Sequence, residues 1–468
     1  MPLPMPTLDE VLASVEAGRD EIVALTQALV RFETVNTGVM PTGNEMPAAA
    51  FLAAKLTAEG IPSEVVESAA GRGNVVSVLA GAGSAGVGER SFALMGHTDV
   101  VPVEDPSLWT VSPFGGESRD GRIWGRGSND MKGTVAASTM AAIFLKRAGV
   151  RLRGELRVET GADEESGGVY GFGWLAEHRP DLVQTTAAIN EGGGGIPLKL
   201  ADGTLAYLFS LGEKGRYEVH LTVRGRGFHA SQPWRADSAI DRAYEVIQRI
   251  KAYEPTLDAS DPLFSHLGTL AGITEQVTND NVAQIITRVG AQNVALGSSL
   301  RALSRMTVGV SMIQAGVKSN SIAERATVVC DVRTLPWQDT DYIAREFAHI
   351  LDGITNVEVD VRTTAVSNAS PQDDPCIEAF QEATRIVLRR YGYDRVIFIP
   401  TLTFGFTDSR LVRPLGVHAY GYTPGHPDAD PAKSGAHNND ESVDIAGLVL
   451  YAQVAVATAW LYLGVMEE

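Results

Sequence analysis

A pair of adjacent acids at the end of a strand-like run restricts the folds open to this chain. Glu164 and Glu165 follow the half-apolar run 156–160 and stand within the glycine-bordered stretch 161–168. Two neighbouring carboxylates repel each other unless water or a cation faces them. Taken alone, the pair is typical of a solvated acidic loop. Four other segments also place a histidine or an acid at a strand end or helix start, and together they favour a shared metal site.

These four segments carry His97, Asp130, Glu191 and His437. Each has a simpler explanation when taken alone. A single His-X-Asp sequence is more often structural, an aspartate near a helix start can cap the helix, and His437 can be a surface histidine. Glu191, however, is the acid at the end of a predicted strand, and four glycines follow it, which lets the backbone approach a metal closely.

Taken together with Glu165, the four residues supply five metal ligands. Asp99 points the same way as His97 in extended backbone and can hold the second ring nitrogen of that histidine. Histidine and carboxylate ligands without thiolates suit zinc, cobalt or manganese. Five ligands exceed what one catalytic zinc ion normally takes, whereas a bridging Asp130 lets them hold two ions. The pattern therefore predicts a binuclear centre. Glu164 is not needed as a metal ligand and is predicted to be a catalytic group.

The bulk composition limits the classes of partner. The chain has 468 residues, a formal net charge of −18 and only two cysteines, Cys330 and Cys376. The negative charge argues against nucleic acid and anionic membranes as partners, and the cysteine count excludes a disulfide framework. We find no signal-peptide order at the N-terminus and no stretch that approaches a membrane span. A cytoplasmic location is expected.

The order of predicted elements indicates two domains. Strand and helix patterns alternate up to residue 212 and return after residue 367, which predicts a discontinuous three-layer α/β domain over 1–212 and 368–468. Between them, 213–367 reads β-α-β-β-α-β, the order of a ferredoxin-like domain. Within it, the stretch 253–305 is expected to be loop and short helices. The two crossings, at 212–215 and 363–370, are natural hinges.

Four runs of sequence resemble the aminoacylase/carboxypeptidase family of co-catalytic zinc enzymes. They are His97-Thr98-Asp99-Val100-Val101-Pro102, Trp124-Gly125-Arg126-Gly127, Asp130-Met131-Lys132-Gly133 and Asp163-Glu164-Glu165-Ser166-Gly167. The resemblance covers nearly the whole chain, in order. It implies that Asp130 bridges two Zn²⁺ ions (Co²⁺ or Mn²⁺ as substitutes). It further implies that His97 and Glu191 complete one ion's ligands, that Glu165 and His437 complete the other's, and that Glu164 is the general base.

The resemblance also implies roles in the inserted domain, as a lid and as the contact of a homodimer. His229, in Gly227-Phe228-His229-Ala230-Ser231, matches a residue that polarises the scissile carbonyl. Asn320 and Arg333 match residues that hold the oxyanion and the substrate carboxylate, although a structural ion pair of Arg333 with Asp331 or Asp360 is the competing interpretation. Arg410 matches a turn in which substrate contact and local structural support are equally plausible.

One departure from the family pattern is the long segment 425–433 before His437, which contains His426 as a competing ligand candidate. The resulting hypothesis is a binuclear amidohydrolase that cleaves an N-acyl amino acid or a dipeptide with a free carboxylate. Two alternatives stay open. An aminopeptidase would need an acid to receive the substrate's free amine, and a metal-dependent peptide-binding protein would need to have lost the base. The acyl group and side-chain preference are beyond the sequence.

Overall fold

A computed structural model describes residues 5–82 and 90–466 of the chain. By contacts between Cα atoms the chain divides into two compact units. Unit 1 comprises Met1–Gly212, Ser370–Thr401 and Thr407–Glu468, and unit 2 comprises Glu213–Ala369 and Leu402–Phe406. The return of 402–406 to unit 2 has no counterpart in the sequence pattern.

Unit 1 is built on a mixed sheet whose strands run in the order β1-β2-β6-β3-β7-β15-β8, with β14 also paired to β8. Strand β3 is parallel to both β6 and β7, and β15 is parallel to β7. The strands are β1 (Ser63–Ala69), β2 (Arg72–Leu79), β3 (Ser91–His97), β6 (Glu155–Gly161), β7 (Ala187–Lys199), β8 (Leu205–Glu213), β14 (Val396–Thr403) and β15 (His418–Pro424). A small sheet joins β4 (Glu117–Arg119), β5 (Arg122–Trp124) and β16 (Ser442–Asp444).

Helices cover both faces of the large sheet. One face packs against α1 (Leu8–Ala17), α2 (Arg19–Val30), α3 (Met46–Ala58), α4 (Gly133–Arg147), α12 (Pro375–Arg390) and α14 (Ile445–Leu463). The other face packs against α5 (Phe172–His178), α6 (Pro180–Val183) and α13 (Ser409–Val412). This is the three-layer α/β arrangement that the alternating pattern predicted, and the fold class is confirmed.

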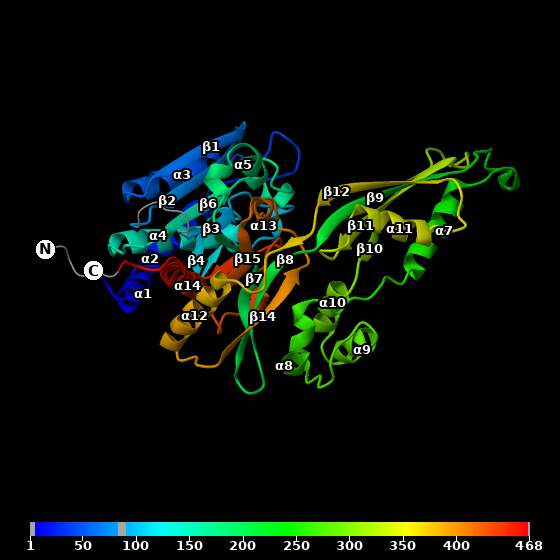
Figure 1. The fold of residues 1–468 in the computed structure, drawn as a ribbon. Coiled ribbons are helices and arrows are strands. Elements are labelled where there is room, and N and C mark those ends of the chain that lie inside the picture. The colour runs from blue at the N-terminus through cyan, green and yellow to red at the C-terminus, as the bar shows by residue number, and fades with distance from the viewer. Residues whose placement is uncertain (1–4, 83–89, 467–468) are drawn as a thin grey trace. The chain divides into compact units, whose positions relative to one another are not determined.

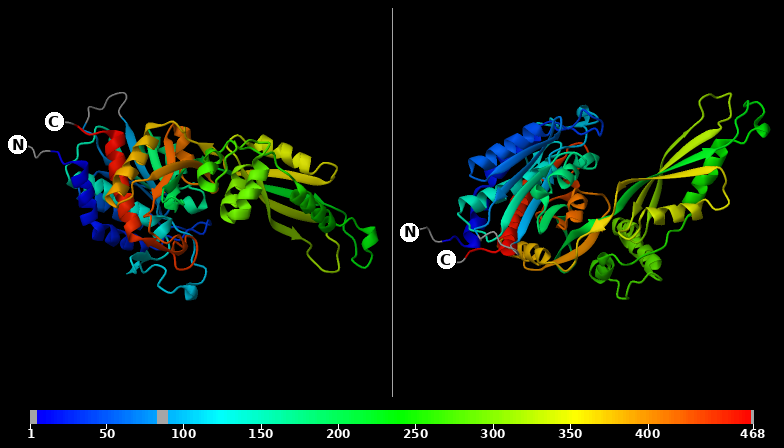
Figure 2. Two further views of the ribbon diagram at one scale, coloured as in Figure 1. Left: turned by 90° about the horizontal axis from the view of Figure 1, so that it is seen from below. Right: turned by 45° about the horizontal axis from the view of Figure 1, so that its top comes forward.

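The apolar helix α14 corrects one expectation. It is long and apolar enough to cross a membrane, so the statement that no stretch approaches a membrane span is wrong by length and composition. Its apolar window is 78% buried inside the structure. Figure 2 shows α14, in red, between α12 in orange and the blue N-terminal helices. A helix that is apolar all round is expected at the centre of a large core, and α14 occupies such a position.

Unit 2 contains a four-stranded antiparallel sheet in the order β10-β11-β9-β12. Its elements run β9 (Gly215–Arg224), α7 (Ala239–Ala252), β10 (Thr307–Ala315), β11 (Arg325–Thr334), α11 (Thr340–Ile350) and β12 (Val357–Ala365). Along β9, buried residues such as Val219 alternate with half-exposed ones such as Glu218, as the sequence alternation predicted. Helices α7 and α11 pack on the buried face, which gives the ferredoxin-like topology.

The stretch between α7 and β10 forms three short helices, α8 (Leu267–Ala271), α9 (Val282–Gln292) and α10 (Val294–Leu303). Lys214, at the start of unit 2, is buried and its Nζ donates to the backbone oxygen of Arg305 at 2.8 Å. Asp261 accepts a hydrogen bond from the backbone N–H of Leu402 at 3.2 Å. These bonds tie the excursion to both segments of unit 2.

Candidate metal centre

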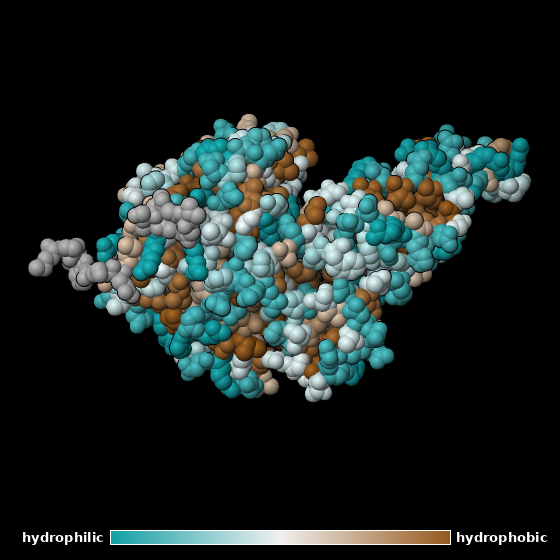
Figure 3. Space-filling model, viewed as in Figure 1, coloured by the Kyte–Doolittle hydropathy of each residue, from teal (hydrophilic) through white to brown (hydrophobic). Residues whose placement is uncertain are grey.

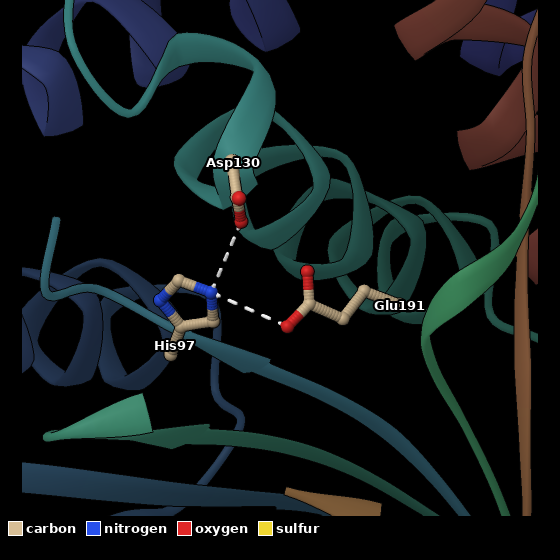
Figure 4. A group of neighbouring side chains, drawn as sticks. All are labelled: His97, Asp130 and Glu191. Carbon is tan, nitrogen blue, oxygen red and sulfur yellow. Dashed lines mark ion pairs between the residues drawn. The ribbon is translucent and has the colours of Figure 1, made fainter. Parts of the chain in front are cut away.

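His97, the last residue of β3, faces acids through both ring nitrogens. Its Nδ1 lies 3.1 Å from the backbone oxygen of Asp99 and 3.5 Å from Oδ1 of the same residue. Its Nε2 lies 3.3 Å from Oδ1 of Asp130 and 3.5 Å from Oε1 of Glu191, so that the three side chains converge (Figure 4). The ring is buried, and its contacts with Asp99 direct Nε2 toward Asp130 and Glu191.

Asp130 also reaches a second group with its other oxygen. Oδ2 of Asp130 lies 3.1 Å from Nε2 of His437, and that nitrogen lies 3.2 Å from Oε2 of Glu165. Each group, His97–Asp130–Glu191 and Asp130–Glu165–His437, offers three ligand atoms that lie within 4.8 Å of one another. A single carboxylate therefore stands between two sets of ligands that could each hold a metal ion.

The sheet topology explains why these residues meet. Strands β3, β6 and β7 are parallel neighbours, and His97 at the end of β3 pairs in register with Gly161 at the end of β6. The carboxyl ends of parallel strands lie at one edge of a sheet, where α/β proteins bind ligands. Glu164 and Glu165 follow β6 in a 3₁₀ turn, and Glu191 lies in β7.

Asp99 holds the turn that carries the paired glutamates. Its Oδ1 accepts a hydrogen bond from the backbone N–H of Glu164, and its Oδ2 accepts one from that of Glu165, each at 3.1 Å. The side-chain amide of Asn36 donates to Oδ2 at 2.8 Å. Asp99 therefore fixes both the ring of His97 and the backbone of the turn, whereas the sequence indicated only the first.

Glu441, to which sequence reasoning assigned no role, holds the loop that carries Asp130. Its carboxylate accepts hydrogen bonds from the backbone N–H groups of Gly127 at 3.0 Å, Asn129 at 2.9 Å and Asp130 at 3.0 Å. The guanidinium of Arg126 donates to the same carboxylate at 2.8 Å. The backbone donors stand more than 300 residues away in the chain, and no sequence signal links them to Glu441.

Electrostatics at the site are dominated by negative charge. Burial raises the pKa of the Glu164 carboxyl well above its usual range, and the nearby Glu191 carboxylate raises it further. Burial, together with the charge of Asp130, raises the pKa of Glu191 to about 7. The carboxylates of Asp130 and Glu165 raise the pKa of His437 to about 10. The cluster is therefore poised to take up positive charge.

The side chains present fit divalent metal ions. Nε2 of His97 and Oδ1 of Asp130 are buried without a hydrogen-bond partner, although buried polar atoms are nearly always paired. Among residues 5–82 and 90–466, no lysine or arginine forms an ion pair with the four acids Asp130, Glu164, Glu165 and Glu191. Uncompensated buried carboxylates are costly, and bound cations would neutralise them. Imidazole and carboxylate donors suit zinc and manganese.

In unit 2, His229 and Asn320 lie side by side. His229 bridges to Ser321, and the backbone N–H of Ala230 donates to the backbone oxygen of Asn320 at 3.0 Å. The backbone N–H of Ser231 donates to Nδ1 of His229 at 3.2 Å. Since that nitrogen accepts a bond from a backbone donor, the neutral ring carries its proton on Nε2.

Arg333 pairs with Asp331, as the competing interpretation foresaw. Its Nε lies 2.7 Å and its Nη2 3.3 Å from the carboxylate oxygens of Asp331, and Nη1 donates to the backbone oxygen of Phe404 at 3.4 Å. Arg216 also donates to Asp331, at 3.2 Å. Two guanidinium groups therefore share one acid.

Arg410 and His426 lie outside both ligand groups. Arg410 is buried, and its guanidinium donates to the backbone oxygens of Gly167 at 2.6 Å and Thr407 at 2.8 Å. The ring of His426 packs edge-on against Tyr391, and its Nδ1 accepts a hydrogen bond from the backbone N–H of Asp428. The long segment before His437 therefore adds no ligand atom to either group.

Comparison with known proteins places this geometry in a family context. The model of peptidase family M20/M25/M40 matches residues 93–460. A probable succinyl-diaminopimelate desuccinylase of Staphylococcus epidermidis is 25% identical over 393 residues, which cover 83% of this chain and 85% of that protein.

Solved structures share the fold. An M20 family metallo-carboxypeptidase from Sulfolobus solfataricus superposes with a TM-score of 0.68 at 18% identity, covering 95% of this chain and 99% of that one. A dinuclear metal binding peptidase of the M20 family from Bacillus subtilis has a TM-score of 0.57 at 15% identity, covering 96% and 99%. At these identities the likeness establishes the fold alone.

Proposed function

The chain belongs to peptidase family M20/M25/M40, and from that membership we propose that it hydrolyses the amide bond of an N-acyl amino acid or a dipeptide with a free carboxylate. Its relatives identify it as a metal-dependent hydrolase of amide bonds. The observation that carries the finer proposal is Asp130, whose two oxygens face separate His–carboxylate pairs while Glu164 lies buried beside them.

The proposed cofactor is a pair of Zn²⁺ ions per chain, with Co²⁺ or Mn²⁺ as substitutes. His97 and Glu191 would hold one ion, Glu165 and His437 the other, and Asp130 both. The bound ions would lower the pKa of a water molecule and polarise the scissile carbonyl. Glu164, buried beside the candidate ligands, would take the proton from the attacking water and deliver it to the leaving amine.

Asp99 contributes by holding its partners in place. It keeps the ring of His97 oriented and, through two backbone N–H groups, keeps the turn of Glu164 at a fixed position. Catalytic groups held within tenths of an ångström lose less entropy on reaching the transition state. We therefore assign Asp99 to positioning the metal ligand and the base.

We further propose that unit 2 acts as a substrate-binding lid. The proton on Nε2 of His229 and the side-chain amide of Asn320 would donate to the oxyanion. Arg333 would anchor the substrate carboxylate, because a guanidinium can pair with a carboxylate through two parallel hydrogen bonds. Closure about the segments that join the units would complete the site.

We propose a homodimer formed through unit 2. Strand β10 lies at one edge of its sheet and leaves Met312 and Ile313 about half exposed. The neighbouring helix α7 exposes Ile240 and Tyr244. Figure 3 shows a further apolar patch on unit 2, over the region of β12 and α11 in Figure 1. An unpaired edge strand beside apolar side chains is a natural surface for a second copy.

A cytoplasmic location is also proposed. Cys330 and Cys376 are both free and buried, in separate units, and so offer no disulfide for an oxidising compartment to form.

The deciding experiment is hydrolysis by the zinc-loaded protein of a panel of N-acetyl and N-succinyl amino acids and free-amine dipeptides. Turnover of acylated substrates supports the proposal. Turnover of free-amine dipeptides alone would favour the aminopeptidase alternative. Binding of panel members without hydrolysis by any of them would favour the metal-dependent binding protein.

A further inference from the structure

The turn 407–410 lies in unit 1 against two of the segments that carry candidate metal ligands. Nη2 of Arg410 donates to the backbone oxygen of Gly167 at 2.6 Å, in the turn of Glu164 and Glu165. One residue earlier, Oγ of Ser409 accepts a hydrogen bond from Nδ2 of Asn190 at 3.2 Å. Asn190 directly precedes Glu191 in β7. One short turn thus contacts the turn that carries Glu164 and Glu165 and the residue that precedes Glu191.

Side chains from other segments bind the turn of the paired glutamates. Gly167 and Gly168 have φ angles of +108° and +70°, and glycine has no side chain with which to hold such a conformation. On one side, Asp99 binds the backbone N–H groups of Glu164 and Glu165. On the other side, Arg410 binds the backbone oxygen of Gly167. The turn is therefore fixed from both sides by side chains distant in sequence.

The burial of Arg410 argues for a permanent contact. Its side chain is 6% exposed, and neighbouring Asp408 is 1% exposed. Burial raises the pKa of the Asp408 carboxyl to about 8, the charge of Arg410 opposes that rise, and no residue of the described chain hydrogen-bonds to the carboxyl of Asp408. A buried charge is costly unless it forms specific hydrogen bonds. Both terminal nitrogens of Arg410 donate to backbone oxygens, which is how a guanidinium serves as a brace for main chain.

We propose that Arg410 and Ser409 are positioning residues of the metal centre rather than substrate contacts. Arg410 fixes the turn that presents Glu164 and Glu165, and Ser409 fixes the strand end that presents Glu191. The inference rests on the proposed function, because that function gives the three acids their roles.

The test is the zinc affinity of Arg410→Ala, measured by competition with a fluorescent chelator on the metal-free protein. Loss of a group that orients a ligand typically costs about 10–100-fold in metal affinity. We expect a loss of that size, together with a lower kcat and a nearly unchanged KM. Ser409→Ala should show a smaller loss of zinc affinity.

Arg413→Ala is the matched control. Arg413 lies in the same segment, and its guanidinium donates to the backbone oxygen of Ala419 at 2.8 Å and to Oγ of Ser370 at 3.1 Å. Its zinc affinity should equal that of the wild type. Arg410→Lys should recover part of the loss, because the ammonium keeps the charge but lacks the planar guanidinium fork whose two terminal nitrogens bind the two carbonyls. Thermal unfolding of each variant checks that it is folded under the conditions in which zinc affinity is compared.

A raised KM with wild-type zinc affinity in Arg410→Ala would make Arg410 a substrate contact and overturn the inference. An equal loss in Arg413→Ala would do the same, because it would reveal general loosening of the segment. Because zinc affinity is measured without substrate, it stays informative if no amide in the panel is hydrolysed, and that result would count against the proposed function alone.

Discussion

Backbone N–H groups fix the candidate ligands of this centre as much as side chains do. Asp99 accepts hydrogen bonds from the N–H groups of Glu164 and Glu165, and Glu441 accepts them from the loop of Asp130. A carboxylate that accepts several backbone donors orders a loop without occupying the space that a metal needs. Two acids that are not candidate ligands, Asp99 and Glu441, therefore hold the backbone that carries the candidate ligands in place.

The substitution Glu441→Gln tests whether Glu441 fixes the loop that carries Asp130. The substitution removes the charge and one acceptor oxygen from a group that binds three backbone N–H groups and Arg126. We expect zinc affinity to fall by about 10-fold or more, measured by chelator competition. Asp440→Asn is the control, because Asp440 binds Thr110 instead. An unchanged affinity in Glu441→Gln would refute the assigned support.

Substituting Glu164 and Glu165 separately should have two different effects, one on kcat and one on metal content. Glu164→Ala should reduce kcat by about 10²–10⁴-fold, the usual contribution of a general base, while about two metal ions stay bound per chain. Glu165→Ala should lower the metal content, measured by elemental analysis after dialysis. If Glu164→Ala lost its metal ions but kept its activity, the assignment of Glu164 as the general base would be wrong.

At the scale of elements, β6 carries a buried acid outside the metal centre. Glu159 is 1% exposed, and neither of its carboxylate oxygens has a hydrogen-bond partner among the described residues. Burial raises the pKa of Glu159 to about 8. The folded protein therefore keeps this proton at pH values where the unfolded chain has lost it, and stability falls as pH rises from about 4.5 to 8.

Glu159→Gln should remove that dependence. We expect the variant to be more stable than the wild type at pH 8, by of the order of 3 kcal/mol, and nearly equal to it at pH 4.5. Denaturant unfolding at both pH values measures the difference. Glu155→Gln, in the same strand but part-exposed and paired with Arg157, should show no such gain. Equal stability of wild type and Glu159→Gln at pH 8 would contradict the prediction.

The turn after β6 tolerates no side chain at Gly168. Its φ is +70°, and an added Cβ would clash with Oδ1 of Asp408 and lie 2.7 Å from Cδ1 of Leu411. Gly168→Ala should cost about 2–4 kcal/mol of unfolding free energy, from strain and overpacking together. Gly149→Ala has a φ of +71° with nothing within 4 Å of the added atom, and should cost only about 1 kcal/mol. Similar losses in the two variants would show that the contact with Asp408 is unimportant.

Sequence patterns predicted elements where local periodicity decides their form, as in β9, whose inward residues are apolar. They were less accurate where tertiary contacts decide. The sequence predicts that the strand leading to Glu191 ends there, yet β7 runs through four glycines to Lys199 because β15 and β8 pair with it. The amphipathic pattern over 8–34 predicts one helix, yet the structure has two, divided at Gly18, where a side chain would collide with Phe144.

The same contrast between local pattern and tertiary contact holds for the candidate site. Ligands that end strands could be predicted from the sequence because strand ends mark one edge of the sheet. Their supports could not, because the bonds from Glu441, Ser409 and Arg410 join residues more than 200 positions apart and follow no local pattern.

For the whole molecule, the dimer proposal predicts a concentration-dependent mass. The wild type should sediment as a dimer at micromolar concentration, and Ile240→Glu with Tyr244→Glu should sediment as a monomer, because buried unpaired charges oppose association. Val294→Glu is the control, since Val294 is 80% exposed on α10 rather than on α7 or β10. A monomeric wild type would end the proposal.

The two ligand groups draw on distant stretches of the polypeptide. His437 meets Glu165 across 272 residues, and Glu441 meets the N–H of Asp130 across 311. During synthesis, a ribosome-bound chain that already displays His97, Asp130, Glu165 and Glu191 still lacks the imidazole and the loop support that its C-terminal portion supplies. A complete pair of ligand groups therefore requires that both ends of unit 1 have joined.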